Sequence, residues 1–200
     1  MKEHVQLDLS ALPLHGRGDA SPTWWGTAAF MLIEGSAFAV GIAMYVYLLS
    51  IAPSWPLAAA PPGLGPGTIV TLILLASLVP NWLVGRWARQ EALRKVQVGT
   101  LVMCLFGIAP LVVRAYEFKA LNVWWDANAY GSVLWLLLGL HSTHLVTDLA
   151  DTIVLAAVLF TRHAHNQRRL GDVEDNVMYW NFVVLTWLPI YGCIYWIPRL

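Results

Sequence analysis

The sequence predicts an all-α membrane protein, a polytopic bundle of five transmembrane helices. Hydrophobic residues make up 58% of the 200-residue chain and charged residues only 12%, whereas about one quarter of an average globular chain is charged. Four stretches contain no Asp, Glu, Lys or Arg, namely 35–85, 96–113, 127–147 and 176–198. Since a spanning helix needs about 20 mostly apolar residues, these stretches are long enough to cross a membrane. The composition excludes a disordered chain, a nucleic-acid binder and a disulfide-rich secreted module.

Five spans are expected, and their apolar runs are continuous rather than alternating, which favours helices over an outer-membrane barrel. They cover about residues 24–50, 68–87, 96–116, 129–160 and 177–196. Five prolines keep the 51–67 loop from being helical throughout. Residues 1–23 lack a long apolar core and are predicted to be a cytoplasmic tail, which leaves 24–200 as the transmembrane domain.

The distribution of basic residues predicts which way the bundle faces. Nine of the 12 Lys and Arg residues fall in the tail, in residues 86–95 or in residues 161–176, and these three segments share one side of the predicted topology. Because loops rich in Lys and Arg stay inside, we expect a cytoplasmic N-terminus and a C-terminus on the outer side.

Ionisable residues inside the predicted spans form the candidate site. Glu34 lies about 15 Å along the first span at ~1.5 Å per residue. The fourth span carries His141, His144, Asp148 and Asp151, whose offsets of 3, 4 and 3 place them on one helical face. Charges at such depth are costly and normally face protein, water or one another. These five residues are predicted to form an intramembrane polar network, which either handles protons or joins helices by hydrogen bonds.

Other chemistry is weighed against this network. His141, His144 and nearby carboxylates are ligand types that suit zinc or iron, but HxxH on one helix is a weak motif, so no metal ligand is assigned. A bis-histidine haem would need axial ligands on facing helices, and all the membrane histidines lie on one. Arg114 and Glu117, three residues apart at the outer end of the third span, are expected to form an interfacial ion pair.

Close helix packing is expected in the first span, where small residues recur at intervals of four at Gly35, Ala39 and Ala43. A proton-coupled transporter that uses Glu34 and the two aspartates of the fourth span is an alternative function. The lack of a visible internal repeat weighs against it, since many transporter folds are built from repeats.

Four motifs resemble subunit III of haem-copper cytochrome c oxidases, and they occur in the family's order on the matching spans. The first span is similar to the family's opening W-W-G-x-x-x-F-x-x-x-E, in which Glu34 matches a buried glutamate. Residues 114–117 resemble the glutamate-bearing end of the third of these helices, and residues 139–146 resemble a G-x-H-x-x-H-V signature. The last motif is similar to E…Y-W-H-F-V-D-x-x-W. The motif positions outside the polar network are Trp24, Trp25, Gly26, Glu174, Tyr179, Trp180 and Trp187.

The chain also departs from this pattern. Asn181 stands where the family has histidine and Val184 where it has aspartate, while Asp148 and Asp151 are acids that the common pattern lacks. We therefore expect the polar contacts of the last two helices to be rewired.

The resemblance implies a non-catalytic accessory subunit of a bacterial respiratory terminal oxidase, in the inner membrane. The complex would be an oxidoreductase, with haem and copper in subunits I and II and no redox centre or catalytic residue in this chain. This chain would dock on the catalytic subunit, hold phospholipid and assist proton or oxygen supply. Longer members have seven helices and this chain matches the last five, so a partner would supply the other two. The same fold would equally suit a nitric oxide reductase or a quinol oxidase, because other chains select the electron donor.

Overall fold

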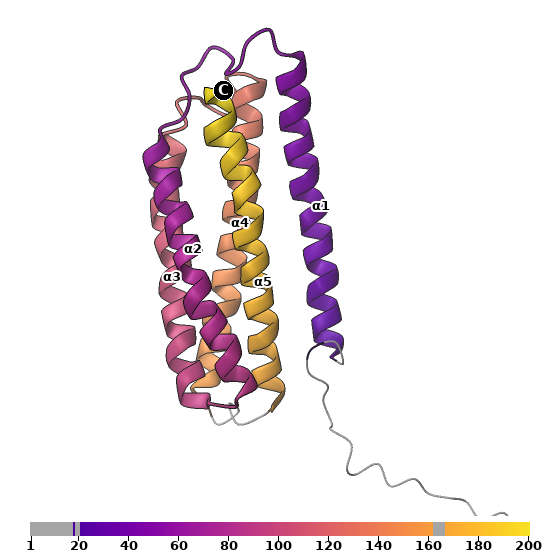
Figure 1. The fold of residues 1–200 in the computed structure, drawn as a ribbon, viewed down its shortest axis with the longest axis vertical. Helices are drawn as coiled ribbons and strands as arrows, with labels where there is room; N and C mark the ends of the chain where they lie inside the picture. Colours follow the sequence, from indigo (N-terminus) through magenta and orange to yellow (C-terminus); the bar gives the residue numbers. More distant parts are fainter. Residues whose placement is uncertain (1–17, 19–20, 162–166) are drawn as a thin grey trace, which may run out of the picture.

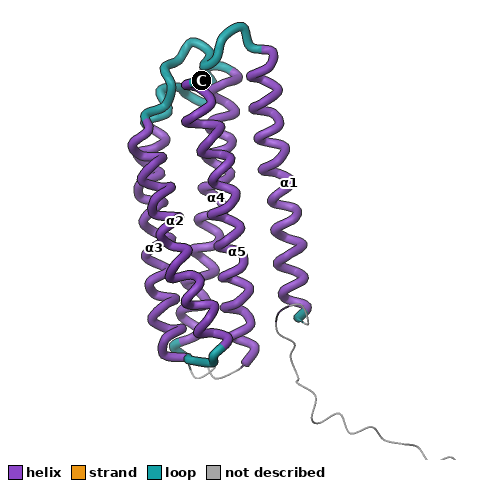
Figure 2. Tube along the Cα trace, in the orientation of Figure 1, coloured by secondary structure: helices purple, strands orange, loops and turns teal. Residues whose placement is uncertain are grey.

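Five long α-helices make up most of the computed structural model, which describes Gly18 and residues 21–161 and 167–200. They are α1 (Pro22–Ile51), α2 (Leu64–Arg89), α3 (Leu93–Lys119), α4 (Ala129–Leu159) and α5 (Gln167–Tyr191). The helices run alongside one another in a single elongated bundle (Figure 1), and the described part contains no strand (Figure 2). All five, the last with the short turns that follow it, are long and apolar enough to cross a membrane. The predicted fold class is confirmed.

Four of the five helices begin before the apolar runs from which they were predicted, and α4 begins at the predicted Ala129. The largest difference is in α5, which was expected to begin near Val177 and begins at Gln167 instead. Its first turns carry charges, among them the ion pair between Arg169 and Asp172 at 2.9 Å. Hydropathy locates the part of a helix that suits lipid, whereas the helix itself continues into polar residues that support it by i,i+3 pairs. Most of the expected tail, residues 1–17 and 19–20, lies outside the described residues.

Local sequence explains several helix ends and bends. Pro22 occupies the first turn of α1 and Pro66 that of α2, where no backbone N–H is needed. The side chain of Asn128 caps α4 by accepting a hydrogen bond of 2.8 Å from the N–H of Gly131. Pro189 lies near the end of α5, just before a π-helical turn at Gly192–Trp196.

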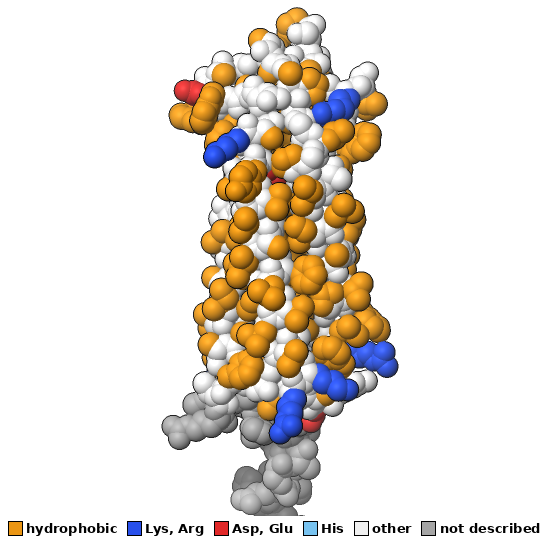
Figure 3. Space-filling model, turned by 90° about the vertical axis from the view of Figure 1, so that its left-hand side faces the viewer, with side chains coloured by type: hydrophobic (Ala, Val, Ile, Leu, Met, Phe, Trp, Pro, Cys, Tyr) orange, Lys and Arg blue, Asp and Glu red, His pale blue; other side chains and the backbone are white. Residues whose placement is uncertain are grey.

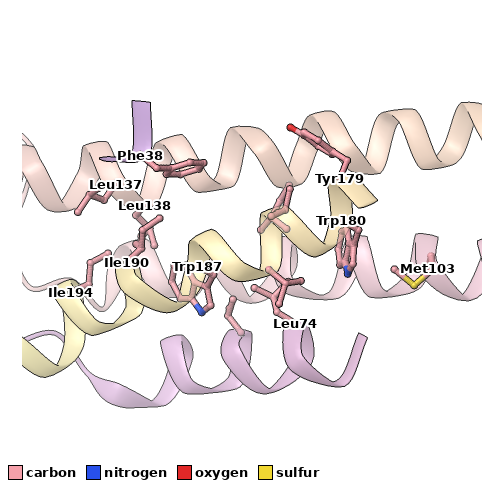
Figure 4. Packing of buried hydrophobic residues seen from close by; sticks show 14 of the residues in the cluster. Phe38, Leu74, Met103, Leu137, Leu138, Tyr179, Trp180, Trp187, Ile190 and Ile194 are labelled. Carbon is pink, nitrogen blue, oxygen red and sulfur yellow. The ribbon is translucent and has the colours of Figure 1, made fainter. Parts of the chain in front are cut away.

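Helices α4 and α5 each contact three other helices, α5 packing against α1, α2 and α4, and α4 against α1, α3 and α5. Trp180 and Trp187 of α5 are almost completely buried, among the residues drawn in Figure 4. Their indole N–H groups donate to hydroxyl groups of α2, to Ser77 at 2.8 Å and to Thr71 at 2.7 Å. These two hydrogen bonds join α5 to α2 and satisfy indole groups that lipid would leave unpaired.

Helix α1 lies at the edge of the bundle, against α4 and α5 (Figure 1). Its buried residues are Phe38, Gly41 and Tyr45. Of the small-residue row, Gly35 is half-buried, whereas Ala39 and Ala43 are exposed and do not pack within this bundle. Bulky Phe38 and Tyr45 direct this face to the bundle.

The surface is divided into zones along the bundle axis. On the face shown in Figure 3, hydrophobic side chains cover the middle of the bundle, and Lys and Arg side chains gather at its two ends. Leu32, Ile33, Leu105 and Val154 are among the large apolar side chains that are more than 60% exposed. An apolar belt of this kind requires lipid or another apolar chain around it.

Candidate functional site: two buried polar clusters

Glu34, His144 and Tyr179 form the first cluster, which we call the Glu34 cluster. They come from α1, α4 and α5. Nε2 of His144 lies 3.0 Å from Oε1 of Glu34, an ion-pair distance at which the alignment is not that of a hydrogen bond. The hydroxyl of Tyr179 donates to the other carboxylate oxygen at 2.7 Å. The ring of Phe38 lies 4.7 Å from that of His144.

The hydrogen bonds of the Glu34 cluster limit where its protons can lie. Nδ1 of His144 is 2.6 Å from the carbonyl oxygen of Leu140, which can only accept, so Nδ1 carries a hydrogen. Nε2 of His144 and Oε1 of Glu34 then face each other at 3.0 Å. Either the imidazole is charged and Glu34 is ionised, or both are neutral with the proton on the carboxyl group. Both arrangements hold the same single proton, which His144 and Glu34 share.

Asp148 lies one turn below His144 on α4 and does not pair with it. Its side chain is 1% exposed, and neither carboxylate oxygen has a hydrogen-bond partner among the described residues. The bond to Leu140 turns the imidazole of His144 toward Glu34 of α1 instead. Asp151 lies on the more exposed side of α4, where it accepts a hydrogen bond of 3.2 Å from Asn176 of α5.

Arg114, Glu117, His141 and Tyr195 form the second cluster, which we call the Arg114 cluster. Nη1 of Arg114 donates to Glu117 at 2.7 Å, and the Tyr195 hydroxyl donates to the other oxygen of that carboxylate at 2.6 Å. The pair expected between residues 114 and 117 does form, and protein encloses it, since the two side chains are 3% and 0% exposed.

The second terminal nitrogen of Arg114 and both ring nitrogens of His141 also have partners, whereas Nε of Arg114 has no hydrogen-bond partner among the described residues. Nη2 of Arg114 lies 3.0 Å from Nδ1 of His141, and a guanidinium can only donate, so Nδ1 is the acceptor. Nε2 of His141 then carries the hydrogen and donates to the carbonyl of Val183 at 3.0 Å. Trp187 covers the guanidinium, whose carbon lies 4.2 Å from the ring centroid. Both ring nitrogens of His141 are thus in use, and this cluster joins α3, α4 and α5.

The family-motif positions at the two ends of the chain have different roles. Trp24 and Trp25 meet edge to face with ring centroids 5.0 Å apart. Trp24 and Glu174 line a cavity of about 330 Å³ together with Asn181. Asn181, which replaces the family histidine, accepts a hydrogen bond of 2.9 Å from Asn81 of α2. Asn181 of α5 therefore bonds to α2, while Asp151 of α4 bonds to α5 through Asn176.

Sequence reasoning did not assign several residues that complete these clusters. Tyr179 was singled out only as a motif position, and Tyr195, Asn81 and Phe38 were not assigned to the site. Asn81 had a usable signal, because an amide in a charge-free span usually bonds across helices. Tyr195 had none, since an aromatic near a span end is ordinary in membrane helices.

No group of three or more His, Cys, Asp or Glu side chains is arranged to hold a metal ion in the part of the chain that the structure describes. His141 and His144, the two nitrogen donors of the metal hypothesis, contact different partners. One contacts Arg114 and the other Glu34.

A bundle of five spanning helices that encloses two clusters of ionisable side chains defines a multi-pass membrane protein with a polar interior. A family model described as cytochrome c oxidase subunit III matches residues 23–198. The chain belongs to the cytochrome c oxidase subunit III family, which confirms the resemblance drawn from its motifs.

Curated relatives carry the same description. Cytochrome c oxidase subunit 3 of Pisaster ochraceus is 28% identical over 154 residues, which cover 74% of this chain and 57% of that protein. The protein of that name from Osphranter robustus is 28% identical over 86% of this chain and 68% of its own length. The Synechocystis relative is 24% identical over 90% of this chain and 77% of its own length. The chain therefore spans between 57% and 77% of these three relatives.

Proposed function

We propose that this chain is a non-catalytic accessory subunit of a bacterial respiratory haem-copper terminal oxidase, in the inner membrane. The observation that carries the proposal is the match to the subunit III family over residues 23–198, nearly the whole chain. The relatives are named as subunits of cytochrome c oxidase, and we extend that assembly to this chain. Its partners would be subunits I and II, which would hold the haem and copper.

The structure supports an accessory role through the way its polar groups are used. The members of the Arg114 cluster bond to one another across helices, which suits a group that holds three helices together. The Glu34 cluster can hold one proton, which suits a part in proton supply. The apolar belt offers area for the catalytic subunit and for phospholipid, and α1 exposes most of its length.

Gentle-detergent purification of the tagged chain from its native membranes tests the proposal. We expect co-purification with a haem-copper subunit, identified by mass spectrometry and by a reduced-minus-oxidised haem spectrum. A nitric oxide reductase or quinol oxidase among the partners would correct the subtype. A stable chain that purifies without a haem protein would reject the accessory role. The proton-coupled transporter would then be the function to test.

A further inference from the structure

A cavity of about 540 Å³ lies between α1, α4 and α5 and leads to Asp148. At one end it is lined by the first turns of α1 and α5 and the last turns of α4, with Thr23, Arg169 and Val158. These helix ends lie together at one end of the bundle (Figure 1). The cavity's inner residues are Asp148 and Tyr179. Asp148 is 11 residues from the end of α4, about 16 Å at ~1.5 Å per residue.

Asp148 requires something that the described protein atoms do not provide. Its carboxyl group is buried, lines the cavity and has no hydrogen-bond partner among the described residues. An unpaired buried carboxylate is so costly that it must take up a proton, meet water or meet a cation. The cavity far exceeds the roughly 30 Å³ that one water occupies, and polar atoms of Asp148 and Tyr179 are available to hold water.

The other charged groups of the cavity favour a cation, and a proton is the simplest one. Asp151 of α4 and Asp172 and Asp175 of α5 line the same space, where Arg169 is paired with Asp172. Four aspartates line the cavity against one arginine, and an excess of one sign of charge raises the local concentration of the opposite charge. From α1, Glu34 faces this region through its contact with Tyr179. No metal-binding group of three or more such ligands occurs among the residues described.

We propose that this cavity is filled with water and loads protons from the surface where α1 begins onto Asp148 and, through the Tyr179 hydroxyl, onto Glu34. Asp148 takes its proton directly from a hydronium ion, which becomes water. For Glu34, a hydronium protonates the Tyr179 oxygen while the hydroxyl passes its own proton to Oε2. The tyrosine ends neutral as it began, and the carboxylate becomes a carboxylic acid.

The route ends at the Glu34 cluster and does not cross the membrane. Phe38 lies against both histidine rings, 4.7 Å from His144 and 6.3 Å from His141. Beyond it, both nitrogens of His141 are bonded, to Arg114 and to Val183. The structure thus assigns a proton reservoir that is open to one side, not a channel. This reservoir specifies how the chain would take part in proton supply. It rests on the proposed function only for that role in proton supply.

Cysteine accessibility tests the water-filled cavity, in a background with Cys104 and Cys193 replaced by serine. Leu155 lines the cavity and is 8% exposed, whereas Ile153 on the same helix is 48% exposed and outside its lining. A membrane-impermeant charged thiosulfonate should label Leu155→Cys at least about tenfold faster than Ile153→Cys, because a charged reagent is excluded from hydrocarbon. Labelling should occur from the side where α1 begins. Equal or reversed rates, or labelling only by a neutral maleimide, would show a cavity filled by lipid or closed, and would overturn the proposal.

Infrared difference spectra of the purified complex test the proton sites. Asp148→Asn should remove a carboxylic acid C=O band that changes with pH. Tyr179→Phe should slow hydrogen–deuterium exchange of the Glu34 band by at least about tenfold, as loss of a proton-relay group does. Tyr191→Phe, which removes a hydroxyl bonded to Thr68 outside the cavity, is the matched control. An unchanged band in Asp148→Asn, or equal exchange in both tyrosine variants, would contradict the proposal. These readouts do not depend on which partners co-purify, so they can fail while the accessory role stands.

Discussion

At the scale of single residues, Arg114 is the buried charge that most needs compensation by its surroundings. A guanidinium that is 2% exposed needs partners within the protein, and those of its two terminal nitrogens come from α3 and α4, while the ring of Trp187 of α5 covers it. Its Nε has no hydrogen-bond partner among the described residues. A buried ion pair adds little net stability, but removal of one partner leaves an uncompensated charge. This asymmetry makes Glu117 the side chain on which the cluster depends.

Glu117→Gln should lower the free energy of unfolding by about 3–5 kcal/mol, because it leaves the Arg114 charge without its counter-ion. Thermal unfolding of the purified complex in detergent measures the change. Asp172→Asn is the matched control, since its pair with Arg169 is 40% and 25% exposed and should cost less than about 1 kcal/mol. Similar losses of unfolding free energy in the two variants would show that burial does not determine how much each ion pair contributes to stability.

Asn81 and Asn181 provide a second residue-scale prediction. Their hydrogen bond of 2.9 Å crosses from α2 to α5, and Asn81 also donates to the carbonyl of Val177 at 3.0 Å. A double-mutant cycle with alanine at both positions should give a coupling of about 0.6 kcal/mol, as hydrogen bonds between membrane helices do on average. Additive effects of the two substitutions would mean that the amides do not interact in the membrane.

At the scale of helices, close approach depends on glycine at particular positions. In α4, a Cβ at Gly131 would collide with the backbone oxygen of Trp124, which cannot rotate away as a side chain can. At Gly139, eight residues further along the same helix, no atom lies within 4 Å of an added Cβ. The start of α4 is therefore fixed against the preceding loop, whereas its middle has room.

Gly131→Ala should destabilise the fold and Gly139→Ala should be neutral or stabilise it by up to about 1 kcal/mol, the difference in helix propensity between the two residues. The yield of folded protein and its thermal midpoint in detergent give the comparison. If Gly139→Ala were the more destabilising variant, the backbone of the loop before α4 would be able to move away from an added Cβ at residue 131.

The sequence predicted the helices better than it predicted the contacts between them, and the reasons are physical. Lipid demands long apolar runs, so the five spans could be read from composition. The rotation of one helix against another is not encoded in spacing along a single helix. An offset of four made Asp148 a natural partner for His144, but the ring bonds to Leu140 and meets Glu34 of another helix. For the same reason the small residues of α1 did not predict its packing face.

At the scale of the whole molecule, the odd number of spans places the ends of the described chain at opposite ends of the bundle (Figure 1). The turn between α2 and α3, with Arg86, Arg89, Arg94 and Lys95 around it, lies at the end where α1 begins. The structure thus places the basic residues of this turn at the end of the bundle where α1 begins, and the sequence had assigned them to the same side of the membrane as the N-terminal tail. The proton cavity opens at that same end, so the orientation decides which compartment supplies its protons.

The positive-inside rule predicts that this end faces the cytoplasm. Alkaline phosphatase, which is active only outside the cytoplasm, should therefore be active when fused after Leu200 and inactive when fused after Gln90, in the turn between α2 and α3. Fusion after Ala120, at the other end of α3, should restore activity and is the internal control. The reverse pattern would place the basic turns outside. Because the same end carries the cavity mouth, that result would also mean that Asp148 and Glu34 draw protons from the outer side. The cysteine-labelling experiment would then give its signal from that side, so the two measurements check each other.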